Sequence, residues 1–371
     1  MLNQEIYLVN PVSRKIVNEG VASVNDDQQR VLRYELDTFV CDGQYEKGLE
    51  HILEVYLKNL NQEQQPGVWV SGFFGSGKSH LVKMLAAFWT DRVFDDGATA
   101  RGIATLPESV KMNLRELTNA GKRFGGLHAA LGTLGAGAGG SVRLSLLRII
   151  FKSAGLPEQY PQARFVLWLQ KEGIFDTVRA AVEKQGDNWA EELDNLYVSG
   201  VLHAAVAAAK PKLYDSAAAC NVAINNEYRP VADVSVDEMV KAIRAALSRN
   251  GQFPLTLVAL DEVQQYIGSD EQRSMDVQET VEACCKMIGS RMLFIGTGQT
   301  AVTGTTHLKK LEGRFTVRIE LSDTDVDAVV RKVILAKKPD AIDALKQVLQ
   351  QNIGEIARQL SGTSIGYRGQ D

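Results

Sequence analysis

Short continuous runs of hydrophobic residues alternate with helical stripes along this chain. The runs are 68–71 (VWVS), 255–262 (LTLVALDE) and 291–299 (RMLFIGTGQ). Runs without polar alternation are typical of strands that are covered on both faces. Helix-forming sequence at 79–90 comes after the first run, and helix-forming sequence at 274–290 separates the second run from the third. This order predicts an α/β fold in which a parallel sheet is flanked by crossover helices.

Helix-forming sequence dominates the rest of the chain. Helices are predicted at 45–60, over 106–155, in a series over 156–248 that includes 189–210, at 323–335 and at 339–360. A glycine-dense stretch at 132–141 interrupts the second of these and is expected to be a flexible surface loop. A short β-like stretch is expected at 5–9.

The first apolar run continues directly into a glycine-rich loop. Residues 72–79 (GFFGSGKS) match the pattern G-x-x-x-x-G-K-[ST] completely, with a strand before and a helix after it. Lys78 is expected to supply a point charge to the β- and γ-phosphates of a nucleotide, and the Ser79 hydroxyl to bind Mg²⁺. His80 is expected to cap or pack beside the loop. The predicted nucleotide-binding residues are Gly72, Gly75, Ser76, Gly77, Lys78, Ser79 and His80.

Two carboxylates end the second run. Asp261 at the end of a parallel strand can hold the Mg²⁺ shell, and Glu262 can polarise an attacking water as general base. Alone, this pair would more simply be an exposed acidic strand end. The upstream glycine loop favours the metal-and-base interpretation. Since Asp261 lies 183 positions after Lys78, a large part of 100–248 is expected to be a helical insertion.

The third run ends in polar residues that are expected to lie between the two motifs. Thr297 is the first candidate for a residue that orients the attacking water, and Gln299 is the second. The alternative is a strand that simply ends in turn residues.

Two arginines follow in 308–321 (LKKLEGRFTVRIEL). Arg314 is the first candidate for an arginine finger that reaches a neighbouring subunit, ahead of Arg318. The alternative is a solvated arginine beside a strand.

Composition narrows the class of protein. The net charge of −4 argues against a wholesale nucleic-acid-binding surface. The four cysteines show neither metal-ligand spacing nor a disulfide framework, and the five histidines share no ligand spacing. No run is long enough to span a bilayer. We therefore expect a cytoplasmic protein without a membrane partner.

Four motifs occur in the order found in AAA+ ATPases: the glycine loop, 257–262 (LVALDE), 294–299 (FIGTGQ) and 311–315 (LEGRF). The chain resembles this superfamily, closest to the branch of origin-recognition and Cdc6-like proteins. It is also similar to the P-loop ATPases of BREX phage-defence systems, the BrxC/PglY family. The stretches that carry this narrower resemblance are 10–28 (NPVSRKIVNEGVASVNDDQ), 67–85 (GVWVSGFFGSGKSHLVKML) and 143–169 (RLSLLRIIFKSAGLPEQYPQARFVLWL).

The resemblance implies an AAA+ fold, ATP with Mg²⁺, and a homo-oligomer that forms a ring or partial ring. It implies an N-terminal extension at 1–66, an ATPase core at 67–320 and the start of a helical lid at 321–371. Lys78 and Ser79 match Walker A, Asp261 and Glu262 match Walker B, Thr297 takes the sensor place and Arg314 the arginine-finger place. Arg331 and Arg358 are candidates for a second sensor.

The same resemblance implies an ATP hydrolase that assembles or remodels a DNA-associated defence complex, alongside a DNA methyltransferase and other BREX components. Contact with DNA, direct or indirect, would involve basic residues such as Lys309 and Lys310. Because BrxC-like proteins are much longer, the chain is expected to be an N-terminal portion. The alternatives are a nucleotide-gated oligomeric scaffold with little turnover and a metabolite kinase.

Overall fold

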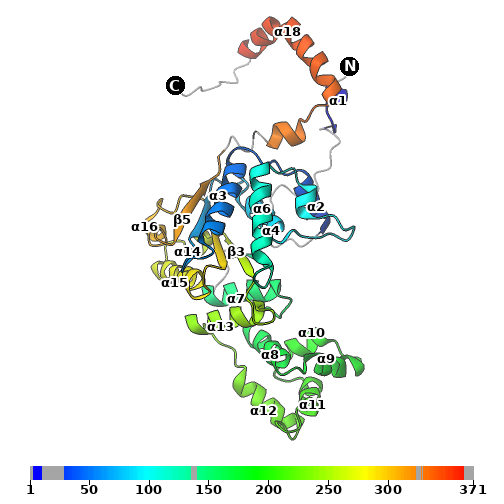
Figure 1. Cartoon of the computed structure of the whole chain (residues 1–371), viewed down its shortest axis with the longest axis vertical. Coiled ribbons are helices and arrows are strands. Elements are labelled where there is room, and N and C mark those ends of the chain that lie inside the picture. Colours follow the sequence, from blue (N-terminus) through cyan, green and yellow to red (C-terminus); the bar gives the residue numbers. More distant parts are fainter. Residues whose placement is uncertain (1–2, 11–28, 135–139, 323–326, 328, 363–371) are drawn as a thin grey trace.

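A five-stranded parallel sheet forms the centre of the molecule (Figure 1). The computed structural model describes residues 3–10, 29–134, 140–322, 327 and 329–362. The strands are β1 (Gly67–Ser71), β2 (Leu127–Thr133), β3 (Leu255–Asp261), β4 (Met292–Gly298) and β5 (Phe315–Glu320). Their order is β2-β3-β4-β1-β5. The predicted α/β fold with a parallel sheet is confirmed.

Helices cover both faces of the sheet. One face carries α2 (Gln29–Asp37), α3 (Gly43–Asn59), α4 (Lys78–Thr90), α5 (Ala100–Ile103) and α6 (Glu108–Gly121). The other carries α7 (Val142–Ser153), α13 (Val236–Leu247), α14 (Val263–Ile267), α15 (Glu271–Met287) and α16 (Thr306–Lys309). Val68 and Val70 pack into the first core and Trp69 into the second, because successive strand side chains point to opposite faces.

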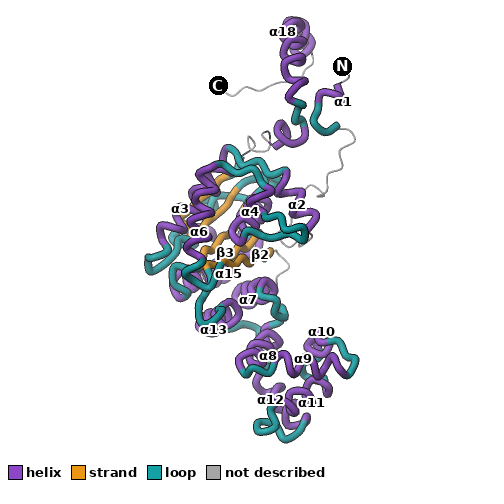
Figure 2. The backbone as a smooth tube through the Cα atoms, turned by 45° about the vertical axis from the view of Figure 1, so that its right-hand side comes forward, coloured by secondary structure: helices purple, strands orange, loops and turns teal. Residues whose placement is uncertain are grey.

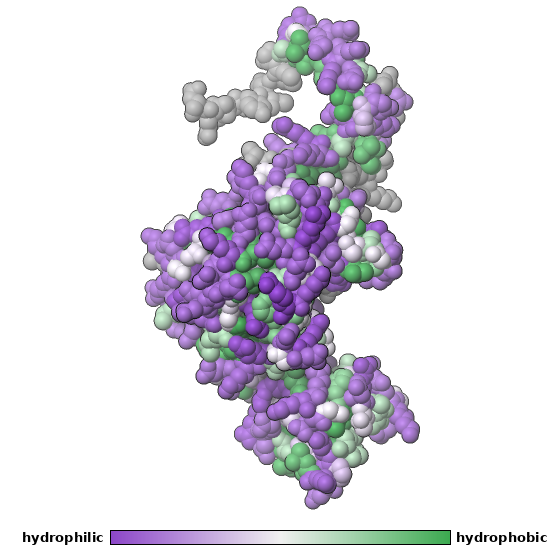
Figure 3. All heavy atoms as spheres, in the orientation of Figure 1, coloured by the Kyte–Doolittle hydropathy of each residue, from purple (hydrophilic) through white to green (hydrophobic). Residues whose placement is uncertain are grey.

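A separate helical body lies at the lower end of Figures 1 and 2. It contains α8 (Tyr160–Lys171), α9 (Phe175–Lys184), α10 (Trp189–Asp194), α11 (Gly200–Ala209) and α12 (Ala217–Glu227). Phe165, Val182 and Val206 belong to a hydrophobic cluster of its own. The insertion predicted over 100–248 thus includes this body, the sheet strand β2, and helices that pack on the sheet, among them α6 and α7. On the face seen in Figure 3 the surface is mainly hydrophilic.

The two ends of the described chain meet at the upper end of Figure 1. The elements there are α1 (Asn3–Ile6), a π-helical turn η1 (Val330–Ile334) and α18 (Pro339–Gly362). Leu8 N donates to Ala336 O at 2.8 Å, and Lys338 N donates to Ile6 O at 2.9 Å. We call this contact between residues 6–8 and 336–338 the terminal clasp. It joins the amino-terminal residues to the segment directly after η1.

Three expectations about secondary structure were wrong. Residues 127–133 were expected to be helical and loop, but they form β2, since pairing with β3 overrides an alanine-rich sequence. Residues 5–9, expected to be β-like, contain the end of α1 and a single bridge at Tyr7. The helix predicted over 189–210 is broken between α10 and α11, where Ser199 caps α11 by accepting from Leu202 N.

Some predicted features lie outside the described residues. They include most of the stretch 10–28, part of the glycine-dense stretch, and part of the helix at 323–335, of which η1 is described. In the described ranges, no helix combines the length and apolar sequence needed to cross a membrane.

Candidate functional site

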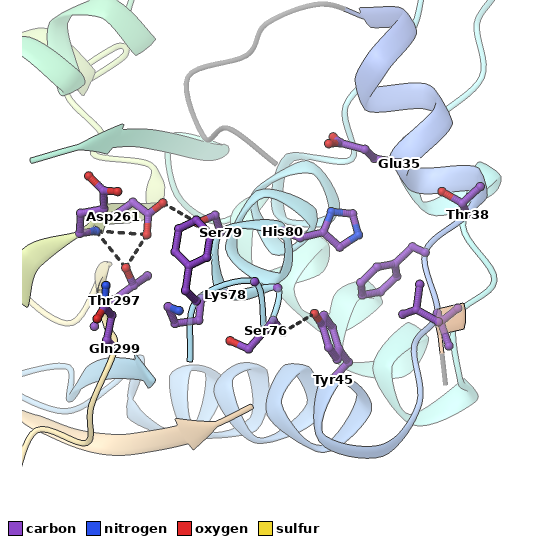
Figure 4. Close-up of a pocket in the computed structure, with 18 of the residues that line it drawn as sticks. Glu35, Thr38, Tyr45, Ser76, Lys78, Ser79, His80, Asp261, Thr297 and Gln299 are labelled. Carbon is purple, nitrogen blue, oxygen red and sulfur yellow. Dashed lines mark hydrogen bonds between the residues drawn. The ribbon is translucent and has the colours of Figure 1, made fainter. Parts of the chain in front are cut away.

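A cavity of about 390 Å³ lies at the carboxyl ends of β3 and β4, beside the start of α4 (Figure 4). The lining includes Phe74, Gly75, Ser76, Gly77, Lys78, Ser79, His80, Asp261, Glu262, Thr297 and Gln299. The structure therefore brings the glycine loop, the acidic pair and the end of β4 together. Because β4 lies between β1 and β3, its last residues lie between the two motifs, as the sequence predicts. Gly72 is not among the lining residues, but its carbonyl accepts a hydrogen bond from the lining residue Lys78.

The glycine loop has a backbone that only glycine adopts without strain. Gly75 and Gly77 have φ of 85° and 87°. At Gly77 a Cβ would lie 1.7 Å from Tyr45 Oη, so a side chain has no room there. Tyr45 Oη donates to Ser76 O at 3.1 Å and fixes the loop from below. At Gly75 a Cβ would meet no atom within 4 Å, so this part of the loop borders open space.

The start of α4 presents hydrogen-bond donors to the cavity. Leu81 N donates to Gly77 O at 2.8 Å, so the amides of Lys78, Ser79 and His80 precede the first intrahelical bond. Such amides, with the positive end of the helix dipole, bind anions. Ser76 Oγ is buried and has no hydrogen-bond partner among the described residues. These unpaired polar groups fit a phosphate chain held by the loop.

The Lys78 side chain folds back over the loop. Its Nζ donates to Gly72 O at 2.7 Å and to Phe73 O at 2.9 Å. Burial lowers the pKa of Lys78, and the nearby Asp261 carboxylate opposes that effect. In the described part of the chain, Lys78 is the only lysine or arginine that lines the cavity. A polyphosphate bound here would therefore meet one side-chain cation from this chain.

Asp261 is the centre of a hydrogen-bond network that joins three elements (Figure 4). Ser79 Oγ donates to its Oδ2 at 2.6 Å, and Thr297 Oγ1 donates to its Oδ1. Glu262 N donates to Asp261 Oδ1 at 3.1 Å and to Thr297 Oγ1 at 3.0 Å. A hydroxyl and a single carboxylate are ligands that Mg²⁺ takes together with phosphate oxygens and water. The pair Ser79 and Asp261 therefore fits a magnesium site.

Glu262 has a left-handed backbone, with φ of 59°. This conformation is uncommon for a residue with a side chain, and such strain occurs at functional sites. Burial, and then the charge of Asp261, raise the pKa of Glu262. A carboxylate of raised basicity beside Ser79 and Asp261 is suited to accept a proton from water.

Gln264 is a site residue that the sequence did not indicate. Its Oε1 accepts from Gln299 N at 2.6 Å and from Thr300 N at 2.9 Å. Gln264 therefore fixes the backbone that follows β4, where Gln299 lines the cavity. A glutamine two residues after a carboxylate carries no signal of this role, because the partners are main-chain amides.

The sequence also did not indicate the apolar end of the cavity. Phe39 and Val40 line it from one side, and Val333 and Ile334 of η1 line it from another. His80 lies against Phe39, with ring centroids 5.6 Å apart. Burial lowers the pKa of His80 to about 4, so the imidazole is neutral at physiological pH.

A buried ion pair between Lys83 and Glu35 lies beside the cavity. Lys83 Nζ lies 2.8 Å from Glu35 Oε2, and their side chains are 6% and 1% exposed. Glu35 also lines the cavity, while Lys83 lies in α4 behind the glycine loop. The pair therefore links α2 to the helix that carries Lys78.

The predicted arginine-finger residue lies elsewhere in this chain. Arg314 precedes the amino end of β5, lines a second cavity of about 370 Å³ and lies 2.5 Å from Glu282. Arg318 pairs with Glu312 at 2.9 Å. Neither lines the cavity beside the glycine loop. The two possible second-sensor residues do not line it either: Arg331 is exposed and Arg358 lies 3.9 Å from Glu355.

No protein-family model matches the chain. Within the described ranges, no group of three or more His, Cys, Asp or Glu side chains is placed to hold a metal ion. A magnesium site at Ser79 and Asp261 is compatible with that result, because Mg²⁺ at such sites takes the rest of its ligands from phosphates and water. The assignment of the cavity depends on its geometry.

Proposed function

We propose that this chain is a P-loop ATPase of the AAA+ type that binds and hydrolyses ATP with Mg²⁺. The observation that carries the proposal is the hydrogen-bonded series Ser79–Asp261–Thr297 beside Lys78 and the glycine loop. It joins a phosphate-binding loop to the residues that a magnesium ion and an attacking water need.

Each residue has a role in this proposal. The amides from Gly75 to Ser79 and the Lys78 ammonium hold the phosphates. Ser79 and Asp261 hold the metal ion, which neutralises phosphate charge when bound. Glu262 accepts the proton of the attacking water, while Thr297 fixes the backbone of Glu262 through its amide.

The apolar end of the cavity fits the base of the nucleotide. Phe39, Val40, Val333 and Ile334 offer apolar surface for a flat aromatic ring. Val333 and Ile334 of η1 belong to the segment 321–371 that is proposed to be the start of the lid. A bound base would therefore contact both the proposed core and the proposed lid.

Two substitutions test the proposal. Lys78→Ala is expected to abolish ATP binding, and Glu262→Gln to preserve binding while blocking hydrolysis. Binding is measured with a fluorescent ATP analogue and hydrolysis by phosphate release. Wild-type hydrolysis in both variants would show that the site is assigned wrongly.

Among the described residues Lys78 is the one lysine or arginine that lines the cavity, which favours an assembly in which a second subunit completes the site. Arg314 precedes the amino end of β5, lines a different cavity and pairs with Glu282, so in this proposal it stabilises transition-state charge in a neighbouring copy. A nucleotide-gated scaffold would use the same contact without turnover. Oligomer mass measured with ATP, with ADP and without nucleotide, beside phosphate release, separates the two: assembly without release favours the scaffold.

The cellular role proposed is in a BREX phage-defence system. It is supported by the likeness of 67–85 and 143–169 to BrxC/PglY proteins. The chain would use ATP to assemble or remodel a DNA-associated complex that includes a DNA methyltransferase. Copurification of the methyltransferase from the same gene cluster with wild-type protein, and its loss with Lys78→Ala, would support this role.

A further inference from the structure

Three loops lie next to one another at the amino ends of β2, β3 and β4, whereas the cavity lies at the carboxyl ends of the strands. They are 122–126 before β2, 248–254 before β3 and 288–291 before β4. Leu255 N donates to Gly126 O, and Thr256 N donates to Arg291 O, each at 2.9 Å. The loops therefore form one continuous surface at the amino ends of the central strands.

Cations gather on this surface without carboxylate partners. They are Lys122, Arg123, Arg244, Arg249 and Arg291, which we call the amino-edge basic surface. None of the five takes part in an ion pair within the described ranges. The three loops contain no Asp or Glu. All five cations are exposed except Arg291, which is half-buried. In a chain of net charge −4, this is a local concentration of positive charge.

The backbone around these cations is well defined. Arg249 N donates to Gln252 O at 2.9 Å and Gln252 N donates to Arg249 O at 3.0 Å, which closes a tight turn. The turn residues Asn250 and Gly251 have φ of 50° and 77°, as a two-residue hairpin turn requires. The turn therefore fixes the backbone position from which the Arg249 side chain extends.

A second cation is fixed by an aromatic ring. The Arg291 guanidinium carbon lies 4.7 Å from the ring centroid of Phe124, which follows Arg123. Arg244, from α13, donates through Nη2 to Met287 O at 2.5 Å, so it lies beside the loop that leads to Arg291. These contacts bring cations from three loops and one helix onto the same edge.

We infer that the amino-edge basic surface binds the phosphate backbone of a nucleic-acid duplex. Guanidinium groups match phosphate oxygens bidentately, and four of the five cations are arginines. A single strand is disfavoured because recognition of unpaired bases uses exposed aromatic rings. Of the two aromatic rings in these loops, Phe124 is covered by Arg291 and Phe253 is buried. The surface lies at the opposite sheet edge from the nucleotide cavity, so a duplex and a nucleotide can be bound together.

The test measures the binding of the full chain to a short labelled DNA duplex by fluorescence anisotropy at several salt concentrations. With about four phosphates neutralised, the slope of log K against log salt is expected to be about −3.6. Lys122→Gln/Arg123→Gln is expected to weaken binding about tenfold or more and to reduce the slope by about 1.8. Arg249→Gln is expected to reduce it by about 0.9.

A matched control separates local contacts from net charge. Lys184→Gln/Lys212→Gln removes two exposed cations from the helical body, neither of which pairs with a carboxylate in the described residues. It is expected to leave affinity and slope unchanged. Melting temperatures of all variants check that they fold.

Several results would overturn the inference. They are absence of duplex binding at low salt, an unchanged slope in both basic-surface variants, or tighter binding to single-stranded DNA or polyglutamate than to duplex. A parallel series with an RNA duplex decides which nucleic acid is preferred. The inference is independent of the proposed ATPase function, because the Lys78→Ala variant is expected to bind the duplex as the wild type does although it no longer binds ATP.

Discussion

The Ser79 hydroxyl donates a 2.6 Å hydrogen bond to Oδ2 of Asp261, although the two residues lie 182 positions apart in the sequence. Ser79 lies in the first turn of α4, and Asp261 is the last residue of β3. The bond joins the first turn after the glycine loop to a buried carboxylate, and it places both proposed magnesium ligands within one contact.

Ser79→Ala is expected to remove one magnesium ligand while leaving the glycine loop intact. Affinity for ATP in the presence of Mg²⁺ should fall about 10- to 100-fold, from loss of an interaction with a charged group. In EDTA, wild-type protein and the variant should bind ATP equally, and titration of a fluorescent analogue under both conditions checks this. Equal affinities with Mg²⁺ present would remove Ser79 from the metal site.

Thr297→Val is expected to lower kcat about 10-fold and to change KM less than about threefold. Thr297 Oγ1 holds both Asp261 and the amide of Glu262, and valine keeps the shape without the hydroxyl. Thr297→Ser, which keeps the hydroxyl, should retain most of the wild-type kcat. Steady-state phosphate release at several ATP concentrations gives both constants. A fall in binding with unchanged turnover would contradict a role in positioning Glu262.

Gly75→Ala and Gly77→Ala form a matched pair. Both impose a side chain on a left-handed backbone, which costs about 1–2 kcal/mol of unfolding free energy. Only Gly77→Ala adds a collision, with Tyr45 Oη at 1.7 Å. It should therefore be the less stable variant in urea unfolding, and Tyr45→Phe should reduce the difference. Equal stability of the two would show that the loop moves away from Tyr45 at little cost.

The pH dependence of hydrolysis should reflect Glu262. Burial and the Asp261 charge raise the pKa of Glu262, and only the ionised form accepts a proton. As pH falls, kcat should therefore begin to decrease at a higher pH than an ordinary glutamate, with a pKa of about 4.3, would give. Log kcat measured against pH at saturating ATP tests this. A flat profile down to about pH 4 would exclude Glu262 as the general base.

Glu35→Gln is expected to destabilise the chain by about 3–5 kcal/mol, because it leaves the Lys83 ammonium buried without an opposite charge. Glu35→Gln/Lys83→Met removes both charges and should be less destabilised than the single variant. Urea unfolding of the wild type, Glu35→Gln, Lys83→Met and the double variant completes the cycle. Additive effects would show that the two charges are not coupled.

The sequence predicts the parts of this molecule that depend on short, strong patterns. Continuous apolar runs gave β1, β3 and β4, because strands buried on both faces need no polar alternation. The glycine loop and the acidic pair could be placed together, since parallel strands end at one edge of a sheet. The roles of these residues in ATP hydrolysis stay predictions.

Other parts depend on contacts that no local pattern carries. β2 is rich in alanine, which favours a helix, and it is a strand because β3 pairs with it. Gln264 acts through main-chain amides of residues 299 and 300, and Phe39 meets His80 only after folding. The amino-edge basic surface is also absent from the sequence pattern, because its cations come from separate loops whose proximity the sheet creates.

The terminal clasp connects residues 6–8 to the wall of the cavity that is proposed to bind a nucleotide. Ile6 and Leu8 form backbone hydrogen bonds with residues 338 and 336. Ile334, two positions before Ala336, lines the cavity. A bulky group attached directly before Ile6 is therefore expected to disturb these two hydrogen bonds and, through them, the position of Ile334 in the cavity wall. Purification tags are therefore better kept away from this end when nucleotide affinity is being compared.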